Sequence, residues 1–244
     1  MEKLFQIIHE DDELLIINKP AGLVCHPTKT DEYSSLISRV RLYLGADSQP
    51  QLINRLDRET SGVTVISKDA VTAQQLRRLW EARRVRKEYL AIVHGFISEA
   101  HGIVDAALGR DEASRVAIKD CVRPDGSPAK TEFWVEKRFT HEALPSLPKS
   151  AAFTLMRVVP HTGRKHQIRI HLAHIGHPIV GDKLYGGDEG LYLALVENRL
   201  TKTQQAQLIL PYHALHAERL GFVWKGQERA YHAEPEPWFD DFSR

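Results

Sequence analysis

The apolar residues of the chain recur in two rhythms, which predict short strands and helices in mixed order. Strands are predicted where apolar residues alternate or form short runs between turn residues, over 5–10, 13–18, 63–66, 88–94, 116–122, 131–137, 152–159 and 212–224. Helices are predicted where apolar residues recur every three or four positions, over 34–44, 67–84, 166–175 and 191–208. A loop is predicted over 143–149, and a polar tail is predicted after 224.

This order of elements predicts the fold class. Only Asp11 and Asp12 separate the first two strands, which is typical of a β-hairpin, and a Pro- and Gly-rich turn joins 116–122 to 131–137. We therefore expect one α+β domain over residues 1–244, with a mixed, mostly antiparallel sheet flanked by helices, rather than a regular βαβ array.

Length and composition are those of a soluble globular protein. The chain has 244 residues, of which 42% are hydrophobic and 27% charged, so it can bury a full core. No apolar run approaches the ~18–20 residues of a membrane span, and the N-terminus lacks the apolar region of a secretory signal. Cys25 and Cys121 lie far apart and form no CxxC pair, which favours reduced thiols and a cytoplasmic protein.

Charge is concentrated locally. The net charge is only +1, yet residues 77–87 hold six basic residues and one acid, Glu81. Such a run is most often a solvated helix face. It leads directly into Tyr89, however, and cations beside an aromatic ring that can stack on a base are what nucleic-acid binding needs. Arg84 and Lys87 are thus predicted to contact a nucleic acid, although Tyr89 taken alone is more often a core residue.

The stretch 52–63 predicts a catalytic carboxylate. Asp57 lies between Arg55 and Arg58 in a turn that ends at Gly62, directly before an apolar strand. A lone Asp in a loop is usually structural. Here the two cations favour its ionised form, and the strand fixes its direction.

A second candidate segment surrounds the predicted start of the helix at 166–175. Arg164, His166 and Gln167 lie there, and the free N–H groups of a helix N-terminus attract phosphate. These three residues are predicted to bind the phosphate groups of a nucleic acid.

Other chemistries find little support. Five histidines fall between 161 and 177, but there is no HExxH motif, so no metal site is expected. The G-x-S-x-G, G-x-G-x-x-G and P-loop patterns do not occur, so no serine hydrolase and no nucleotide cofactor are expected.

Five motifs, in order, resemble those of the RluA-type pseudouridine synthases. They are Asn18–Val24 with His26 and Pro27, Arg55–Gly62, Lys87–Gly95, Thr162–His171 continued by Gly176–Asp182, and Leu215–Ala217. Two departures accompany the match. Asn54 stands where the family usually has His, and the first motif begins only 18 residues from the start of the sequence, so no N-terminal S4 domain is expected. We therefore expect the catalytic domain itself to choose the substrate.

The resemblance implies an isomerase that converts specific uridines in tRNA or rRNA to pseudouridine after flipping the base out, without metal or cofactor. It implies that Asp57 acts as nucleophile or base, that Arg169 is its counter-ion, and that Tyr89 stacks on uracil and moves a proton. Arg55 would fill the gap left by the base or hold its phosphate, and Arg58 would contact RNA. No membrane and no obligatory protein partner are expected.

Two other classes stay open at this stage. A non-catalytic RNA-binding module of the same fold would bind RNA without turnover. An N-glycosidase using Asp57 would release free uracil, which an isomerase does not.

Overall fold

The computed structural model describes residues 5–27, 35–45, 47–142 and 150–244, which form two compact units. Unit 1 comprises Met1–Glu88 and His216–Pro237, and unit 2 comprises Tyr89–Leu215 and Trp238–Arg244. The predicted loop over 143–149 and the first residue of the predicted helix 34–44 lie outside the described residues.

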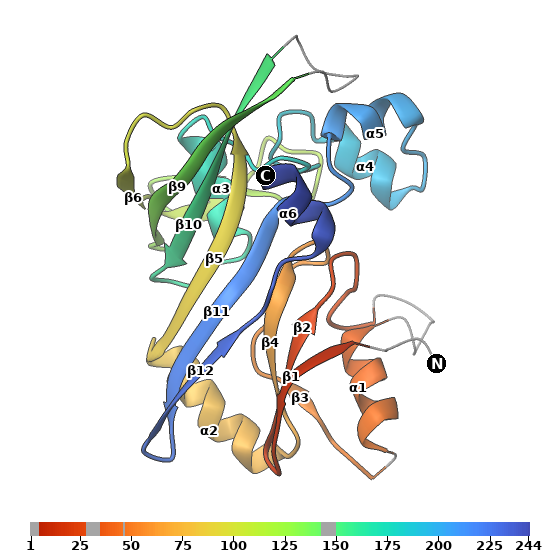
Figure 1. The fold of residues 1–244 in the computed structure, drawn as a ribbon, viewed down its shortest axis with the longest axis vertical. Coiled ribbons are helices and arrows are strands. Elements are labelled where there is room, and N and C mark those ends of the chain that lie inside the picture. The colour runs from red at the N-terminus through yellow and green to blue at the C-terminus, as the bar shows by residue number, and fades with distance from the viewer. Residues whose placement is uncertain (1–4, 28–34, 46, 143–149) are drawn as a thin grey trace. The chain divides into compact units, whose positions relative to one another are not determined.

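Unit 1 is built on a sheet with the order β1, β2, β4, β11, in which β12 also pairs with β11 and β3 with β4 (Figure 1). These strands are β1 Gln6–Glu10, β2 Leu14–Lys19, β3 Gln51–Leu52, β4 Ser61–Ser67, β11 Leu215–Trp224 and β12 Gln227–His232. The pairs are antiparallel except that between β4 and β11, which is parallel. Two helices, α1 Leu36–Leu44 and α2 Ala70–Glu81, accompany the sheet.

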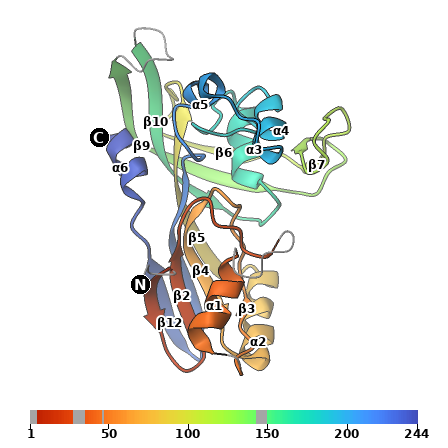
Figure 2. The same cartoon turned by 90° about the vertical axis from the view of Figure 1, so that its right-hand side faces the viewer.

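Both faces of β2 are buried, because its alternating side chains enter two apolar clusters. Leu15 and Ile17 pack with residues of α1, whereas Leu14 and Ile16 pack with Leu76 of α2 and with β11 and β12. Figure 2 shows α1 and α2 beside these strands. The polar residue before each helix starts it: the side chains of Ser35 and Asp69 accept a hydrogen bond from a backbone N–H of the first turn.

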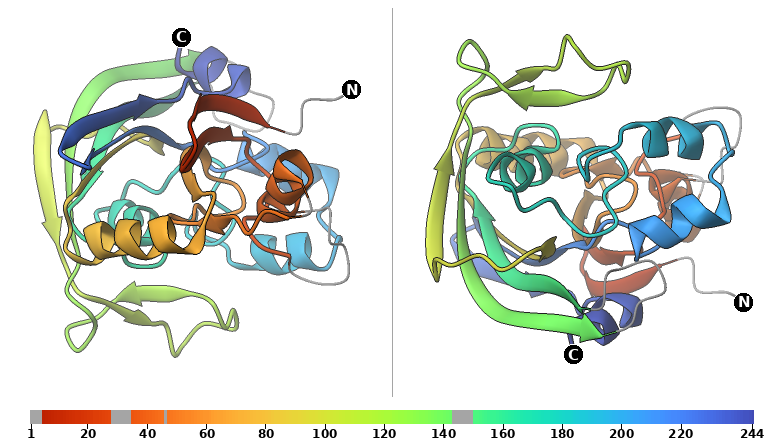
Figure 3. Two further views of the ribbon diagram at one scale, coloured as in Figure 1. Left: turned by 90° about the horizontal axis from the view of Figure 1, so that it is seen from below. Right: turned by 90° about the horizontal axis from the view of Figure 1, so that it is seen from above.

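Unit 2 holds an antiparallel sheet with the order β5, β10, β9, β6. Its strands are β5 Val85–His94, which enters the unit at Tyr89, β6 His101–Asp105, β9 Lys130–Glu142 and β10 Ser150–Pro160. A small separate ribbon pairs β7 Leu108–Arg110 with β8 Asp120–Val122, and Figure 3 shows it (yellow-green) outside the main strands. The helices are α3 Gln167–His174, α4 Gly190–Val196, α5 Lys202–Leu208 and α6 Pro237–Ser243.

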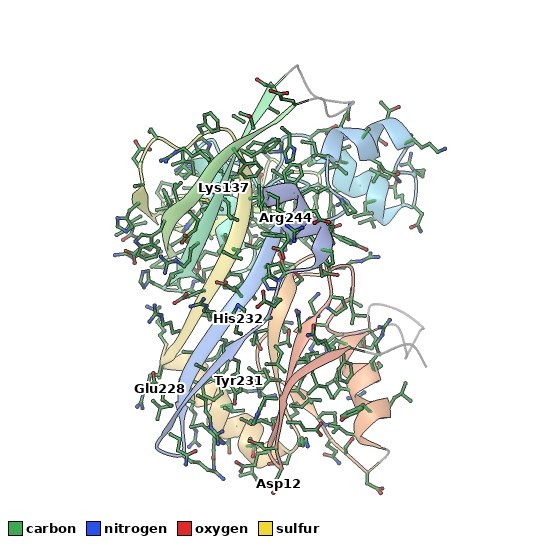
Figure 4. The ribbon with its side chains drawn as sticks, viewed as in Figure 1. Asp12, Lys137, Glu228, Tyr231, His232 and Arg244 are labelled. Carbon is green, nitrogen blue, oxygen red and sulfur yellow. The ribbon has the colours of Figure 1, made fainter. Side chains whose placement is uncertain are left out.

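The last helix closes one face of unit 2. Helices α3 and α6 lie on opposite faces of β9 and β10 (Figures 1 and 2). Phe239 and Phe242 of α6 are buried in the same apolar core as Phe153. The Lys137 ammonium donates to the carbonyls of Ser243 and Arg244, both at 2.7 Å, and Figure 4 labels Lys137 and Arg244. Two phenylalanines of α6 are thus part of the core of unit 2.

The fold class is confirmed: the protein is α+β, with a mixed, mostly antiparallel sheet flanked by helices. The first hairpin, α1, α2, β5, β10 and α3 lie within a few residues of their predicted ranges. That one catalytic domain spans 1–244 stays a prediction. Among the described residues, no helix has the length and apolar character needed to span a membrane.

Three predicted segments are wrong in detail. The helix expected over 191–208 is two helices, because the chain turns at Asn198 (φ 54°) and Thr201 then caps α5. Of the strand expected over 116–122, only Asp120–Val122 forms one, and it pairs with β7. The expected polar tail contains β12 and α6, because Lys225 and Gly226 form a tight turn with positive φ.

Candidate active site

The Asp57 loop connects β3 to β4 in unit 1 and is anchored at its entry by Asn54. The Asn54 side chain accepts from the Val65 N–H at 2.7 Å and donates to the Val63 carbonyl at 3.1 Å. One amide thus ties the entry of the loop to the strand at its exit. Asn54 thus has a structural role in holding the Asp57 loop.

The exit of the loop is held by a close backbone approach to β11. Ser61 and Gly62 pair with His216 and Ala217, and a Cβ on Gly62 would lie 2.2 Å from the Ala217 carbonyl oxygen. Gly62 also has φ +114°, a conformation that L side chains rarely adopt. A glycine is therefore required here on two grounds.

A buried serine–histidine pair reinforces this contact. The His216 Nε2–H donates to the Ala233 carbonyl at 2.9 Å. The other ring nitrogen, Nδ1, therefore accepts from the Ser61 hydroxyl at 2.8 Å. Burial lowers the pKa of His216 to about 4. At neutral pH the ring is neutral and joins the Asp57 loop to β11 and to the residue after β12.

A buried lysine supports the same loop from the other side. The Lys19 side chain is inaccessible to solvent, and its ammonium donates to the carbonyls of Pro20, Leu23 and Arg58 at 3.0, 2.9 and 3.1 Å. Burial lowers the pKa of Lys19 to about 8, while the charge of Asp57 is among those that oppose this shift. A protonated lysine therefore lies within electrostatic range of Asp57 and favours its ionised form.

One further contact supports the Asp57 loop, and its charged residues differ in their exposure to solvent. The Cys25 thiol contacts the Leu56 carbonyl at 3.3 Å, and burial raises the pKa of that thiol. Arg58 donates through Nε to the Gly22 carbonyl at 3.2 Å, and its side chain is exposed. Arg55 is also exposed, whereas Asp57 is half-buried. The two arginines that flank Asp57 in the sequence thus expose their positive charge to solvent.

In unit 2, Arg169 forms a buried ion pair with Asp182. Its Nε and Nη2 donate to the two carboxylate oxygens of Asp182 at 2.7 and 2.9 Å. Burial would raise the pKa of Asp182, but the Arg169 guanidinium outweighs burial and holds that pKa well below its usual range. The backbone N–H groups of Leu184 and Tyr185 also donate to this carboxylate.

Tyr185 extends this arrangement to the start of α3. The Arg169 guanidinium lies over the Tyr185 ring, 5.0 Å from its centroid, and the Tyr185 hydroxyl is 2.9 Å from Nδ1 of His166. His166 precedes α3 with φ 54° and makes no side-chain cap. Asp182, Arg169, Tyr185 and His166 thus form one connected set.

The other residues predicted near α3 have different roles. Arg164 is exposed and donates to the Pro128 carbonyl at 3.2 Å. Gln167 is buried: its amide donates to the Lys130 carbonyl and the Thr131 hydroxyl, and its oxygen accepts from the Thr162 hydroxyl and the Arg164 N–H. The amide thus has four partners within the protein and holds the Arg164 backbone, while its contact with RNA stays a prediction.

Tyr89 is the first residue of unit 2, on β5 opposite Val158 of β10. Its ring is half-buried against the apolar core of that unit. Arg84 and Lys87 belong to unit 1, where Arg84 is exposed and burial lowers the pKa of Lys87.

Several histidines between 161 and 177 form hydrogen bonds within the protein. Both ring nitrogens of His171 have partners, the Thr131 hydroxyl at 2.8 Å and the Ala106 carbonyl at 2.9 Å. No group of three potential metal ligands converges within the described parts of the chain.

The structure therefore places the predicted residues in two sets. Asp57, Arg55, Arg58, Arg84 and Lys87 lie in unit 1, and Tyr89, Arg164, His166, Gln167 and Arg169 lie in unit 2. The approach of Asp57 to Tyr89 and Arg169 stays a prediction of the resemblance. Sequence reasoning missed four supporting residues, Lys19, Asp182, Tyr185 and His216. Three of them, Lys19, Asp182 and His216, lie inside the recognised motifs.

Solved structures of similar fold define the class of protein. The chain superposes on human RNA pseudouridylate synthase domain containing 4 with a TM-score of 0.68 and 26% identity, covering 96% of this chain and 90% of that one. Human RNA pseudouridylate synthase domain containing 1 gives a TM-score of 0.71 at 23% identity, covering 96% and 84% of the two chains. This is the fold of a pseudouridylate synthase domain.

The family follows from the sequence match. Residues 13–174 match the model of the RNA pseudouridylate synthase family, and this chain belongs to that family. The matched range contains Asp57, Tyr89 and Arg169. The predicted resemblance is thereby confirmed.

Curated relatives of similar sequence are also named as pseudouridine synthases. An RNA pseudouridine synthase of Aquifex aeolicus, named as uncharacterized, is 32% identical over 213 residues, which is 85% of this chain and 63% of that protein. Ribosomal large subunit pseudouridine synthase D of Nitrosomonas europaea is 37% identical over 218 residues, which is 88% of this chain and 57% of the relative. The dual-specificity RNA pseudouridine synthase RluA of Vibrio parahaemolyticus is 37% identical over 186 residues, covering 75% and 70% of the two proteins. The chain thus spans less than two thirds of the first two relatives.

Proposed function

We propose that this protein is an RNA pseudouridine synthase that isomerises uridines in rRNA or tRNA. Family membership supports this reaction, and so does the anchoring of the Asp57 loop. Lys19, Asn54, Gly62 and His216 fix this loop from several sides, which is the preorganisation that a catalytic carboxylate needs.

The reaction rearranges bonds within one nucleotide. The N1–C1′ glycosidic bond breaks, the uracil turns, a C5–C1′ bond forms, and the C5 proton leaves to solvent while N1 gains one. Asp57 starts the reaction, either by attacking the nucleoside or by taking a proton from its sugar. No cofactor is needed, because the reaction involves no net oxidation or group transfer.

Three further groups serve this chemistry in our proposal. Arg169 is the counter-ion of Asp57, and Asp182 orients the guanidinium for that role because it binds both Nε and Nη2. Tyr89 stacks on the flipped uracil and moves the C5 proton. Flipping costs about a few kcal/mol, and least in loops, so a loop uridine is the expected target.

The exposed cations bind the RNA around the target. Arg55 fills the gap left by the base or holds its phosphate, and Arg58, Arg84, Lys87, Arg164 and His166 contact the backbone. With rRNA or tRNA as its substrate, the protein is proposed to act in the cytoplasm.

The test measures tritium release from C5-tritiated uridine in bulk tRNA and rRNA. Wild type is expected to release tritium, whereas Asp57→Asn is expected to lose release while remaining folded. The matched control is Asp12→Asn, an exposed aspartate in the turn between β1 and β2 that is labelled in Figure 4, and it is expected to react as wild type. Substantial release by Asp57→Asn would refute the carboxylate assignment.

The same assay separates the two other classes. Free uracil in the products would indicate an N-glycosidase, and RNA binding without tritium release would indicate a binding module. Tyr89→Phe is expected to bind RNA but to release little tritium, and an unchanged rate would exclude proton transfer by Tyr89.

A further inference from the structure

The C-terminal end of α2 carries a group of exposed arginines. Arg77, Arg78, Arg83 and Arg84 are all exposed, and α2 leads through the last two into β5 (Figure 1). Arg77 donates to the Gln51 amide oxygen at 2.5 Å. Within the described residues no carboxylate pairs with Arg78, Arg83 or Arg84. We call these four residues the α2 arginine group.

The backbone of Arg83 has a conformation that favours glycine. Its φ is +56°, and it follows the last residues of α2. The Arg83 N–H donates to the Trp80 carbonyl at 3.1 Å, and the Arg84 N–H donates to the Leu79 carbonyl at 2.9 Å. These two bonds define a Schellman motif, in which the left-handed position is usually glycine because a Cβ is unfavourable there.

Stabilisation of the helix explains only part of this arrangement. Cations at a helix C-terminus interact favourably with the helix dipole, and Arg78 within the last turn already provides one. An arginine at the left-handed position opposes stability, since glycine would adopt that conformation without the Cβ penalty. The fold therefore does not require an arginine at position 83.

The positive charge of the α2 arginine group indicates an anionic partner. The whole chain has a net charge of +1, whereas residues 77–87 have six basic residues and one acid. Of the basic residues beside the group, Arg86 pairs with Glu88 at 2.7 Å, and Lys87 is half-buried. Unpaired guanidinium groups bind phosphate through several N–H donors at once, and an RNA backbone offers phosphates at regular spacing.

We propose that the α2 arginine group is a binding surface for the phosphate backbone of the substrate RNA, and that Arg83 accepts a left-handed backbone in order to place its guanidinium there. This proposal rests on the proposed function. It adds a sequence-independent surface that sets RNA affinity and its dependence on salt, without touching the reacting base.

The test combines RNA affinity with stability. The affinity of unmodified bulk tRNA and rRNA is measured between 50 and 200 mM salt. Each arginine that contacts a phosphate should contribute about 0.7–0.9 to the slope of log affinity against log salt. Arg83→Gly is expected to lower the slope by about that amount, and the triple variant Arg78→Gln, Arg83→Gln, Arg84→Gln by roughly two to three times as much.

Arg83→Gly separates a binding role from a structural one. Its Tm is expected to equal the wild-type value or to exceed it by up to about 4 °C, although its RNA affinity falls. The matched control is Arg219→Gln in the same unit, an exposed arginine beside Glu218, which is expected to leave the slope unchanged.

The possible outcomes are distinct. If wild type releases tritium from RNA but the triple variant keeps the wild-type salt slope, the surface is refuted and the proposed function stands. If Arg83→Gly lowers the Tm, Arg83 has a structural role and the argument from its backbone fails. If wild type neither binds RNA at 50 mM salt nor releases tritium, the proposed function itself fails.

Discussion

The Nε and Nη2 atoms of Arg169 donate to the two carboxylate oxygens of Asp182, at 2.7 and 2.9 Å, in a pair that is almost fully buried. A guanidinium held at two nitrogens has its plane and direction fixed. Replacing either partner would leave a charge buried without compensation.

Asp182→Asn is expected to lower the free energy of unfolding by about 3–5 kcal/mol, because it keeps the shape of the side chain but leaves the Arg169 charge uncompensated. Activity should fall on the order of a hundredfold, since a displaced Arg169 guanidinium could no longer serve as the proposed counter-ion of Asp57. Urea unfolding and tritium release measure the two effects.

A matched control for this pair is Asp120→Asn in the same unit. Asp120 pairs with Lys165 at 3.0 Å, and that lysine is 48% exposed. Its loss is expected to cost less than about 1 kcal/mol. Equal costs for the two variants would contradict a special role for the buried pair.

Gly62→Ala is expected to destabilise the protein by about 2–5 kcal/mol and to abolish activity. An alanine there combines an unfavourable φ of +114° with a Cβ 2.2 Å from the Ala217 carbonyl oxygen. Gly226→Ala is the control, because its φ is +78° but nothing lies within 4 Å of the added Cβ. The difference between the two unfolding free energies contains the collision with Ala217 and the greater backbone penalty at φ +114°. A difference near zero would show that β11 moves aside.

Lys19→Met is expected to lower the free energy of unfolding by about 2–4 kcal/mol. Methionine has a similar length but leaves the carbonyls of Pro20, Leu23 and Arg58 without a donor. Lys68→Met is a control in the same unit, since its ion pair with Glu10 is partly exposed and should contribute little. If Lys19→Met has the same free energy of unfolding as wild type, water replaces the ammonium as the donor to these carbonyls.

Acid is expected to weaken the fold through His216. Burial lowers the pKa of His216 to about 4 from 6.5, so the unfolded chain binds a proton more readily than the folded one. This contribution to stability is fully present above pH 6.5 and is lost as the pH falls toward 4. Between pH 7 and pH 5 the loss is about 2 kcal/mol for this residue, as urea unfolding at the two pH values would measure.

Two variants isolate that histidine. His216→Gln is expected to be less stable at pH 7 but to lose less on acidification, because the titrating ring is absent. Ser61→Ala removes the donor to Nδ1 but keeps the ring, so most of the pH dependence should remain. His94 and His171, whose pKa values burial also lowers, add to the acid sensitivity.

The sequence by itself determined the strands and helices whose signals are local. The periodicity of Leu36, Ile37 and Val40 predicts α1 because those side chains must share one face, and Asp69 marks the start of α2 because its carboxylate caps a turn three residues away. Asp57 could be found for a similar reason, since the turn and its flanking arginines lie within eight residues.

Only the tertiary structure decided which distant residues support these groups. Asp182 is the partner of Arg169, thirteen positions away, and His216 holds Ser61 across 155 positions. No periodicity encodes such contacts, because they depend on which strands pair and on where burial removes water. The polar-looking end of the chain shows the same limit: Phe239 and Phe242 enter the core of unit 2 only because β9 and β10 leave a face for α6 to cover.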